Sequence, residues 1–199
     1  MSKPIEDYGF ISNMVTGALV ARDGSMDWLC LPRFDSDACL AALLGDVQHG
    51  HWKIAPACEI LSISRRYRPG TTILETSFET VKGTITLIDF IPFTDDEQFV
   101  DVVRIVRGDV DQVPMHMELT LRFGYGRVVP WVRRQDYGLS AVAGSDAVRL
   151  FTAVELRGED FTTVADFNVG ATANVTFTLS YCPSHKSARP QQEIGRAHV

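Results

Sequence analysis

Residues 18–45 read ALVARDGSMDWLCLPRFDSDACLAALLG, and this stretch is the part of the chain that best predicts its fold. Two runs of β-forming residues flank Asp23-Gly24, a pair that turns a hairpin because glycine accepts a positive φ at little cost. In the second half, Asp35 or Ser36 can cap a short helix over Ala38–Leu44. The stretch therefore predicts a hairpin followed by an apolar helix that packs on a sheet.

Outside this stretch, the hydrophobic pattern of the chain has period two. Apolar and polar residues alternate, which is the pattern of strands with one buried and one wet face. The runs are separated by turn signals and cover residues 74–80, 85–89, 99–106, 113–123, 138–142, 147–154 and 174–181. Many short strands joined by turns predict an all-β fold, an antiparallel β-sandwich with one short helix near its N-terminus.

The composition excludes several classes of partner and compartment. The chain has 25 acidic and 19 basic residues and a net charge of −6, so it lacks the basic face that nucleic-acid binding needs. It has no apolar run long enough to span a bilayer, which argues against a membrane protein. The first ten residues, MSKPIEDYGF, lack the apolar core of a signal peptide, and the four cysteines are scattered. We therefore expect a cytoplasmic protein with reduced cysteines.

The domain organisation is expected to be simple. No linker composition or repeat interrupts the chain early, so residues 1–183 are expected to form one domain and residues 184–192 to begin a linker. The last seven residues, Glu193–Val199, resemble the in-frame translation of a sequencing-library adapter. We expect this tail to be non-native.

Two groups of residues are candidates for a site. Arg33 and Asp35 follow a strand end, where ligand-facing groups collect, although a helix cap or a local ion pair explains them more simply. Tyr125, Arg127 and Trp131 combine aromatic faces that stack on sugar rings with a planar hydrogen-bond donor. The opposing interpretation is a glycine bulge whose aromatic side chains fill the core. The residues alone do not favour either interpretation of this second group.

The common catalytic and metal-binding patterns are missing from the sequence. There is no nucleophile elbow, zinc-protease motif or phosphate loop, and pairs such as Asp23 with Asp27 carry little information. His49 and His51 are two residues apart, but no further ligand completes a metal site, so we interpret them as a surface pair. We predict no catalytic residue, no metal and no cofactor for this chain.

Several segments together carry a family resemblance that covers nearly the whole chain up to Pro183. They are Pro4–Gly9, Arg22–Ser36, Ala41–Gly45, Gly50–Trp52, Arg65–Tyr67, Leu74–Thr76, Asp89-Phe90, Tyr125–Arg127 and Leu179–Tyr181. The chain resembles the amino-terminal domain of trehalase-like and glucoamylase-like enzymes of glycoside hydrolase family 15. The resemblance implies a β-supersandwich that a linker joins to a catalytic (α/α)6 barrel.

This resemblance also implies what the chain does. The two catalytic glutamates of the family lie in the barrel, and no position here matches them, so this chain alone is expected to be inactive. The parent enzyme would hydrolyse α,α-trehalose or short α-glucans with inversion and without an organic cofactor. Arg33, Asp35, Tyr125, Arg127 and Trp131 are then expected at the substrate rim or at the barrel interface. The alternative is a stand-alone carbohydrate-binding or interaction β-sandwich, with a polar surface and one aromatic groove instead of a wide apolar patch.

Overall fold

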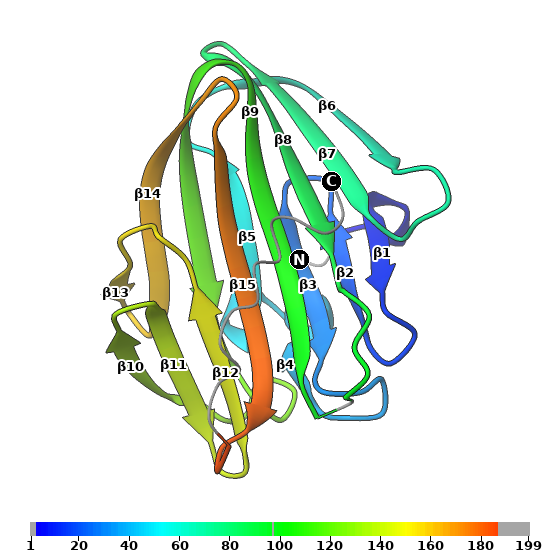
Figure 1. The fold of residues 1–199 in the computed structure, drawn as a ribbon, viewed down its shortest axis with the longest axis vertical. Coiled ribbons are helices and arrows are strands. Elements are labelled where there is room, and N and C mark those ends of the chain that lie inside the picture. Colours follow the sequence, from blue (N-terminus) through cyan, green and yellow to red (C-terminus); the bar gives the residue numbers. More distant parts are fainter. Residues whose placement is uncertain (1–2, 97, 187–199) are drawn as a thin grey trace.

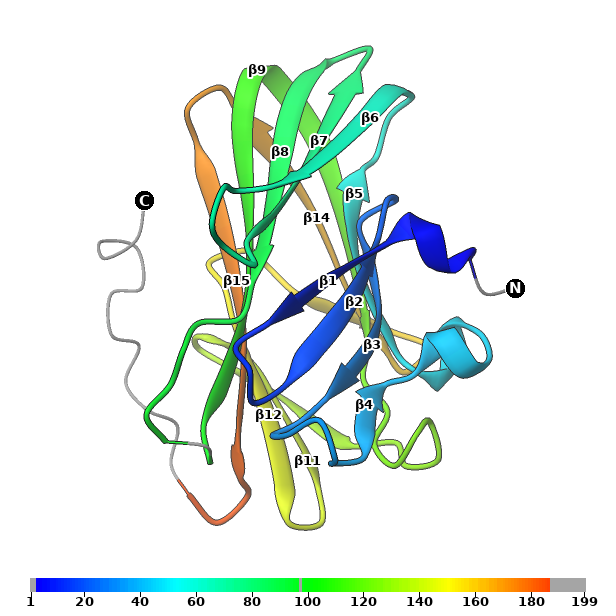
Figure 2. The same cartoon turned by 90° about the vertical axis from the view of Figure 1, so that its right-hand side faces the viewer.

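β-Strands make up most of the computed structural model, which describes residues 3–96 and 98–186. The strands are stacked in two layers (Figures 1 and 2), and every strand pair among the described residues is antiparallel. This arrangement confirms the predicted all-β antiparallel sandwich. The expected tail Glu193–Val199, and all but three residues of the expected linker 184–192, lie outside the described residues.

The strands are β1 (Tyr8–Ser12), β2 (Gly17–Ala21), β3 (Ser25–Cys30), β4 (Ala38–Leu40), β5 (His51–Pro56), β6 (Ile60–Tyr67), β7 (Leu74–Thr80), β8 (Gly83–Phe90), β9 (Val100–Thr120), β10 (Trp131–Gln135), β11 (Gly138–Ala143), β12 (Asp146–Phe151), β13 (Arg157–Glu159), β14 (Thr162–Gly170) and β15 (Asn174–Pro183). Three single turns of 3₁₀ helix complete the list: η1 (Ile5–Asp7), η2 (Ala42–Leu44) and η3 (Val47–His49).

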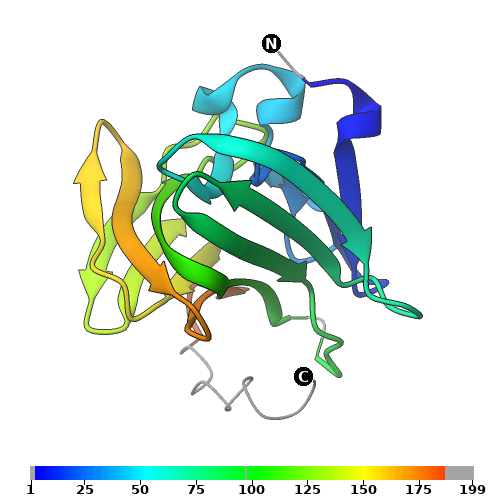
Figure 3. The ribbon, with the colours of Figure 1, turned by 90° about the horizontal axis from the view of Figure 1, so that it is seen from above.

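The long strand β9 belongs to both layers. Its first half pairs with β8 and β15, and its second half pairs with β5 and β14. The sequence suggested two separate strands here, at 99–106 and 113–123. Asp111, with φ of 56°, lies between these two runs, at the point where β9 passes from one layer to the other. Figure 3 shows β9 curving between the two layers.

A buried arginine joins the two layers at the centre of the core. The Nε of Arg104 on β9 donates to Asp89 Oδ1 on β8 over 2.7 Å, and neither side chain is exposed. Its Nη1 donates to the carbonyl of Trp52 on β5 over 2.6 Å, and its Nη2 donates to the carbonyl of Gly24 over 2.8 Å. The guanidinium also lies 5.1 Å from the Trp52 ring centroid. Buried charges cost stability unless they are paired and hydrogen-bonded, so the fold requires Arg104 to keep its ion pair with Asp89 and its hydrogen bonds to the two carbonyls.

The predicted hairpin at Asp23-Gly24 is confirmed as β2–β3. Gly24 has φ of +81°, and its carbonyl accepts from both Arg104 and the Ile54 N–H of β5. A Cβ at this position would lie 2.1 Å from the Ile54 carbonyl oxygen. Glycine is therefore required both by the backbone conformation and by the close contact with β5.

The predicted helix over Ala38–Leu44 is wrong. Ala38–Leu40 forms strand β4, which pairs with β3, and only Ala42–Leu44 makes one 3₁₀ turn. All three residues of β4 are buried, so pairing with β3 satisfies the main chain while it hides every apolar side chain. Tertiary packing overrides the helix propensity of alanine and leucine here. No helical turn in the described part of the chain is long and apolar enough to cross a membrane.

We expect Arg104→Met to lower the free energy of unfolding by about 3–5 kcal/mol, because it leaves the Asp89 carboxylate buried without its partner. Arg107→Met is the matched control, since it breaks a partly exposed pair with Asp109 on the same strand and should cost about 1 kcal/mol or less. Urea denaturation measures both. Equal losses in the two variants would contradict the role of Arg104.

We expect Gly24→Ala to destabilise the chain by about 2–4 kcal/mol, because the new methyl group collides with β5 in addition to straining the turn. Gly144→Ala is the control. Gly144 also has a positive φ, of 62°, but no atom lies within 4 Å of the position that a Cβ would take there, so strain alone should cost about 1 kcal/mol. Thermal unfolding of both variants separates the collision from the strain.

Candidate functional site

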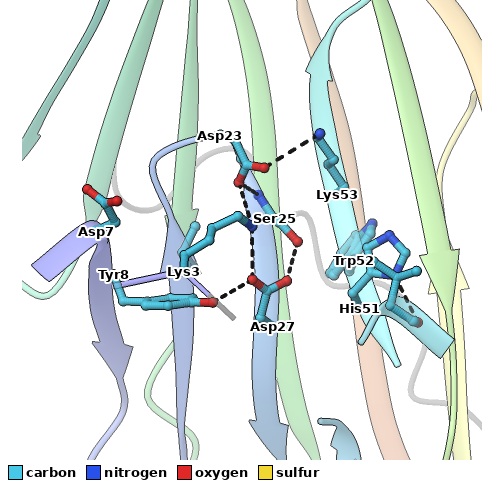
Figure 4. A network of polar contacts seen from close by, with 12 residues as sticks. Lys3, Asp7, Tyr8, Asp23, Ser25, Asp27, His51, Trp52 and Lys53 are labelled. Carbon is cyan, nitrogen blue, oxygen red and sulfur yellow. Dashed lines mark hydrogen bonds and ion pairs between the residues drawn. The ribbon is translucent and has the colours of Figure 1, made fainter. Parts of the chain in front are cut away.

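A polar network around Asp27 holds the N-terminal segment against the β2–β3 hairpin (Figure 4). Asp27 Oδ2 accepts from the Tyr8 hydroxyl over 2.7 Å and from Lys3 Nζ over 3.0 Å, while Oδ1 accepts from Ser25. Lys3 also pairs with Asp23 over 3.0 Å, and Lys53 approaches the other oxygen of Asp23 at 3.5 Å. The network therefore links Lys3 and the start of β1 to the hairpin and to β5.

These contacts give Asp23 and Asp27 a structural role. Both oxygens of the Asp27 carboxylate are bonded, and its side chain is buried. Although burial opposes it, the charge of Lys3 holds the pKa of Asp23 below its usual range. Burial, together with the hydrogen bond to Asp27, raises the pKa of Tyr8 well above its usual range. The shared lysine thus lets two carboxylates hold the N-terminal segment on the hairpin.

The two histidines of the predicted surface pair have different environments. His49 is exposed and bonds through Nδ1 to Asp46, whose side chain caps η3. His51 is buried, with Nδ1 near the Val47 carbonyl and Nε2 3.2 Å from Glu118. The interpretation as a surface pair is therefore correct for His49 alone. Within residues 3–96 and 98–186, no group of three histidine, cysteine or acidic side chains is placed to hold a metal ion.

The Arg33–Asp35 corner forms a local ion pair. Arg33 Nε donates to Asp35 Oδ1 over 2.9 Å, and both side chains are exposed. This contact lowers the pKa of Asp35. Asp35 does not cap a helix, because the helix expected there is strand β4. The corner is near the loop that follows β9, since Asp37 lies 3.9 Å from the position of a Cβ on Gly124.

The loop of residues 121–130 contains Tyr125 and Arg127 and rests on β3 and β4 (Figure 2). The Tyr125 N–H donates to the Ala38 carbonyl over 3.1 Å, and the Tyr125 ring lies 6.1 Å from the Trp28 ring. Gly124, Tyr125 and Gly126 all have positive φ, so the loop is a tight glycine-rich turn. Tyr125 and Arg127 are exposed, so the Tyr125 ring does not fill the core, whereas Phe123 of the same loop packs against it.

Trp131 begins the edge strand β10 and is 69% exposed, with Arg133 stacked at 5.0 Å from its ring centroid. It belongs to a group of exposed apolar side chains that we call the aromatic rim. Val129, Trp131 and Phe161 of the aromatic rim line one groove, and its other members, Tyr125 and Val128, come from the loop that leads to Trp131. Phe161 is 82% exposed and comes from the β13–β14 turn, a residue that the sequence analysis missed. Its φ of 60° places it where turns usually carry glycine, but sequence alone did not indicate this position.

A groove lies beside the aromatic rim, between the edge strands β10 and β13. Its first part has a volume of about 420 Å³, and a second part of about 380 Å³ shares Val132, Gly158 and Thr163 with it. We call both parts together the β10–β13 groove. Arg122 lines it and is only 6% exposed. The alternating pattern had placed Arg122 on a wet face, so sequence analysis missed its burial.

We expect Tyr8→Phe to lower the free energy of unfolding at pH 7 by about 1.5–3 kcal/mol, because it removes a hydrogen bond to a carboxylate. A tyrosine whose pKa is raised on folding stabilises the fold fully below its unfolded pKa, about 10, and loses that contribution as the pH rises further. The difference in the free energy of unfolding between the wild-type chain and Tyr8→Phe should therefore become smaller above about pH 10.

Ser25→Ala is the matched control for this measurement, because it removes another donor to Asp27 but no group that titrates. The difference in the free energy of unfolding between Ser25→Ala and the wild-type chain should stay constant from pH 8 to pH 11. Urea denaturation across this range measures both variants. A Tyr8→Phe gap that widens with pH would contradict the assignment.

Comparisons with known proteins agree with this architecture. The family model described as "Trehalase-like, N-terminal" matches residues 1–194. The Trehalase of Mycolicibacterium smegmatis is 42% identical over 86 residues, which are 43% of this chain and 13% of that protein. The Trehalase of Thermoplasma volcanium is 27% identical over 157 residues, which are 77% of this chain and 25% of that protein.

Trehalase 1 of Sulfolobus acidocaldarius is 33% identical over 131 residues, which are 66% of this chain and 22% of that protein. The chain thus spans a quarter or less of the length of these relatives. Because the family model matches nearly the entire sequence, the chain belongs to the family of trehalase-like N-terminal domains.

Proposed function

We propose that this chain is the non-catalytic N-terminal domain of a glycoside hydrolase of family 15. In this proposal it packs against a catalytic (α/α)6 barrel of the same protein and helps to shape the substrate site. The parent enzyme hydrolyses α,α-trehalose or short α-glucans with inversion, in the cytoplasm. The observation that carries the proposal is the aromatic rim, because exposed apolar clusters of this kind mark interaction surfaces.

The backbone supports an interface at the aromatic rim. Asp160 and Phe161 both have positive φ in the β13–β14 turn, a conformation that Asn-Gly or Asp-Gly would adopt with less strain. A phenylalanine that is strained and also exposed contributes little to the stability of the chain itself. Strained residues of this type cluster at functional surfaces, which favours a role for Phe161 in binding a partner.

The five residues that sequence analysis proposed for the substrate rim or barrel interface fall into two groups, one at the aromatic rim and one on the corner beside it. Tyr125 and Trp131 belong to the aromatic rim, and Arg127 is in the same loop. Arg33 and Asp35 lie on the neighbouring corner, where their exposed ion pair can be reached by a packed domain. We propose Tyr125, Arg127 and Trp131 as interface residues, and Arg33 and Asp35 as residues of its border.

The first test of the proposal is hydrolysis. Glucose release from trehalose and from maltooligosaccharides is measured for this chain alone and for the full-length protein that contains it. We expect turnover only with the full-length protein, because the proposal places both catalytic carboxyl groups in the barrel. Turnover by this chain alone would refute the non-catalytic role. Saturable glycan binding by this chain without any domain contact would favour the stand-alone carbohydrate-binding alternative.

A matched pair of substitutions tests the docking surface. Val129 and Val110 are 54% and 52% exposed, and Val129 belongs to the aromatic rim while Val110 lies on β9 beside Asp111. In the isolated chain, Val129→Asp and Val110→Asp should each change stability by about 1 kcal/mol or less, because both side chains already face solvent.

In the full-length protein, only Val129→Asp should lower the thermal midpoint, since it buries an unpaired carboxylate in the interface. Differential scanning calorimetry of both proteins measures the effect. Equal effects of the two substitutions in the full-length protein would argue against docking at the aromatic rim.

A further inference from the structure

Arg122 is a buried cation for which the described chain supplies no acidic partner. Its Nη1 donates to two backbone carbonyls, Leu121 O at 2.8 Å and Phe161 O at 3.3 Å. Among the described residues, no carboxylate lies within ion-pair distance of it. Burial lowers the pKa of Arg122.

Other buried charged groups of the chain are paired. Arg104 bonds to Asp89, Asp27 to Lys3, and Glu75 to both Arg66 and Arg68. A buried guanidinium without a counter-charge costs several kcal/mol, so native proteins rarely leave one unpaired. Since Arg122 lines an open groove, a partner from outside the described chain can reach it.

The β10–β13 groove has the shape and lining to take an extended segment. Leu119, Leu121 and Val132 supply apolar lining, and Glu159 at the end of β13 and Asp160 of the β13–β14 turn also line the groove. Because these two acidic residues disfavour a strongly acidic occupant, the segment is expected to carry a single acidic residue, placed at Arg122. β10 pairs only with β11, and β13 pairs only with β14, so each strand has one edge whose main-chain groups lack a strand partner in the described chain. Figures 1 and 3 show the two edge strands side by side at the same border of the sandwich. A strand added at such an edge gains main-chain hydrogen bonds and places alternate side chains in the groove.

We propose that the β10–β13 groove binds an extended segment of the catalytic domain, and that an aspartate or glutamate of this segment pairs with Arg122. This inference rests on the proposed function, because it takes the occupant from the domain that packs on the aromatic rim. Arginine suits this role, since its planar fork of donors matches a carboxylate through two parallel hydrogen bonds. The curated relatives contain ample chain to supply the segment, as the matched regions cover a quarter or less of their length.

The groove can be tested by photo-crosslinking in the full-length protein. Val132 lines both parts of the groove and is replaced by p-benzoylphenylalanine in one protein, while Tyr125 of the aromatic rim is replaced in a second. Crosslinked peptides are identified by mass spectrometry. We expect position 132 to crosslink to an extended segment of the catalytic domain that contains an acidic residue.

Each crosslinking protein is then combined with Arg122→Gln, Arg122→Lys or the control Arg107→Gln. Arg122→Gln should lower the yield at position 132 about tenfold or more, since truncating one partner of a buried charge pair weakens binding strongly. Arg122→Lys keeps the positive charge but lacks the planar donors of the guanidinium, so the crosslinking yield at position 132 should be intermediate. Arg107→Gln should leave the yield unchanged. Near-UV circular dichroism confirms that each variant is folded, and the lysine variant carries the test if the glutamine variant is not.

The outcomes separate this inference from the proposed function. Crosslinks to the catalytic domain that do not depend on Arg122 would overturn the carboxylate anchor. Crosslinks at position 125 but none at position 132 would overturn occupation of the groove and leave the docking surface intact. Crosslinks at position 132 to a second copy of the chain would replace the proposed occupant. Absence of crosslinks at both positions would overturn the inference together with the docking surface.

Discussion

The guanidinium of Arg104 is the interaction on which the rest of the sandwich depends. It reaches the carboxylate of Asp89 in its own layer and the carbonyls of Trp52 and Gly24 on the opposite side. These contacts hold the two layers together across the half of β9 that pairs with β8 and β15. Desolvation of two charges is offset only because the guanidinium has a partner in each layer. A core built from apolar residues alone would tolerate more sliding of one layer over the other.

The edge strands at the two ends of the sandwich differ in whether side chains cover their free main-chain groups. At β1, the Tyr67 hydroxyl accepts from the Phe10 N–H and donates to the Phe10 carbonyl, so a side chain blocks the edge. Arg65 adds hydrogen bonds to the carbonyls of Asp7 and Val20. At the opposite border, β10 and β13 have exposed residues throughout. Because proteins usually protect free edges against unwanted pairing, this open edge beside the aromatic rim supports the interface that we propose.

The sequence predicted local structure well and burial less well. The hairpin at Asp23-Gly24 was predicted because glycine marks the turn directly. The strand at Ala38–Leu40 was missed because a continuous apolar run does not distinguish a buried strand from a helix. Arg122 was missed for a different reason. The alternating pattern assigns each residue to one face of a strand, and it placed Arg122 on the face exposed to water. That face is covered at Arg122 by the turn at Phe161, about forty residues later in the chain, so the pattern could not predict the burial of Arg122.

The segment of residues 18–45 contains many chemically active side chains, yet the structure uses them to position other residues. Asp27 anchors the N-terminal segment, and Gly24 supports Arg104. The strand that follows, β4, then supplies the carbonyls that hold the next loop: Cys39 O accepts from the Arg122 N–H, and Ala38 O accepts from the Tyr125 N–H. The segment that identifies the family thus orients both the groove and the aromatic rim, although none of its own side chains lines the groove. For this reason, the residues that identify the family and the residues of the proposed binding surface can differ within one domain and still depend on each other.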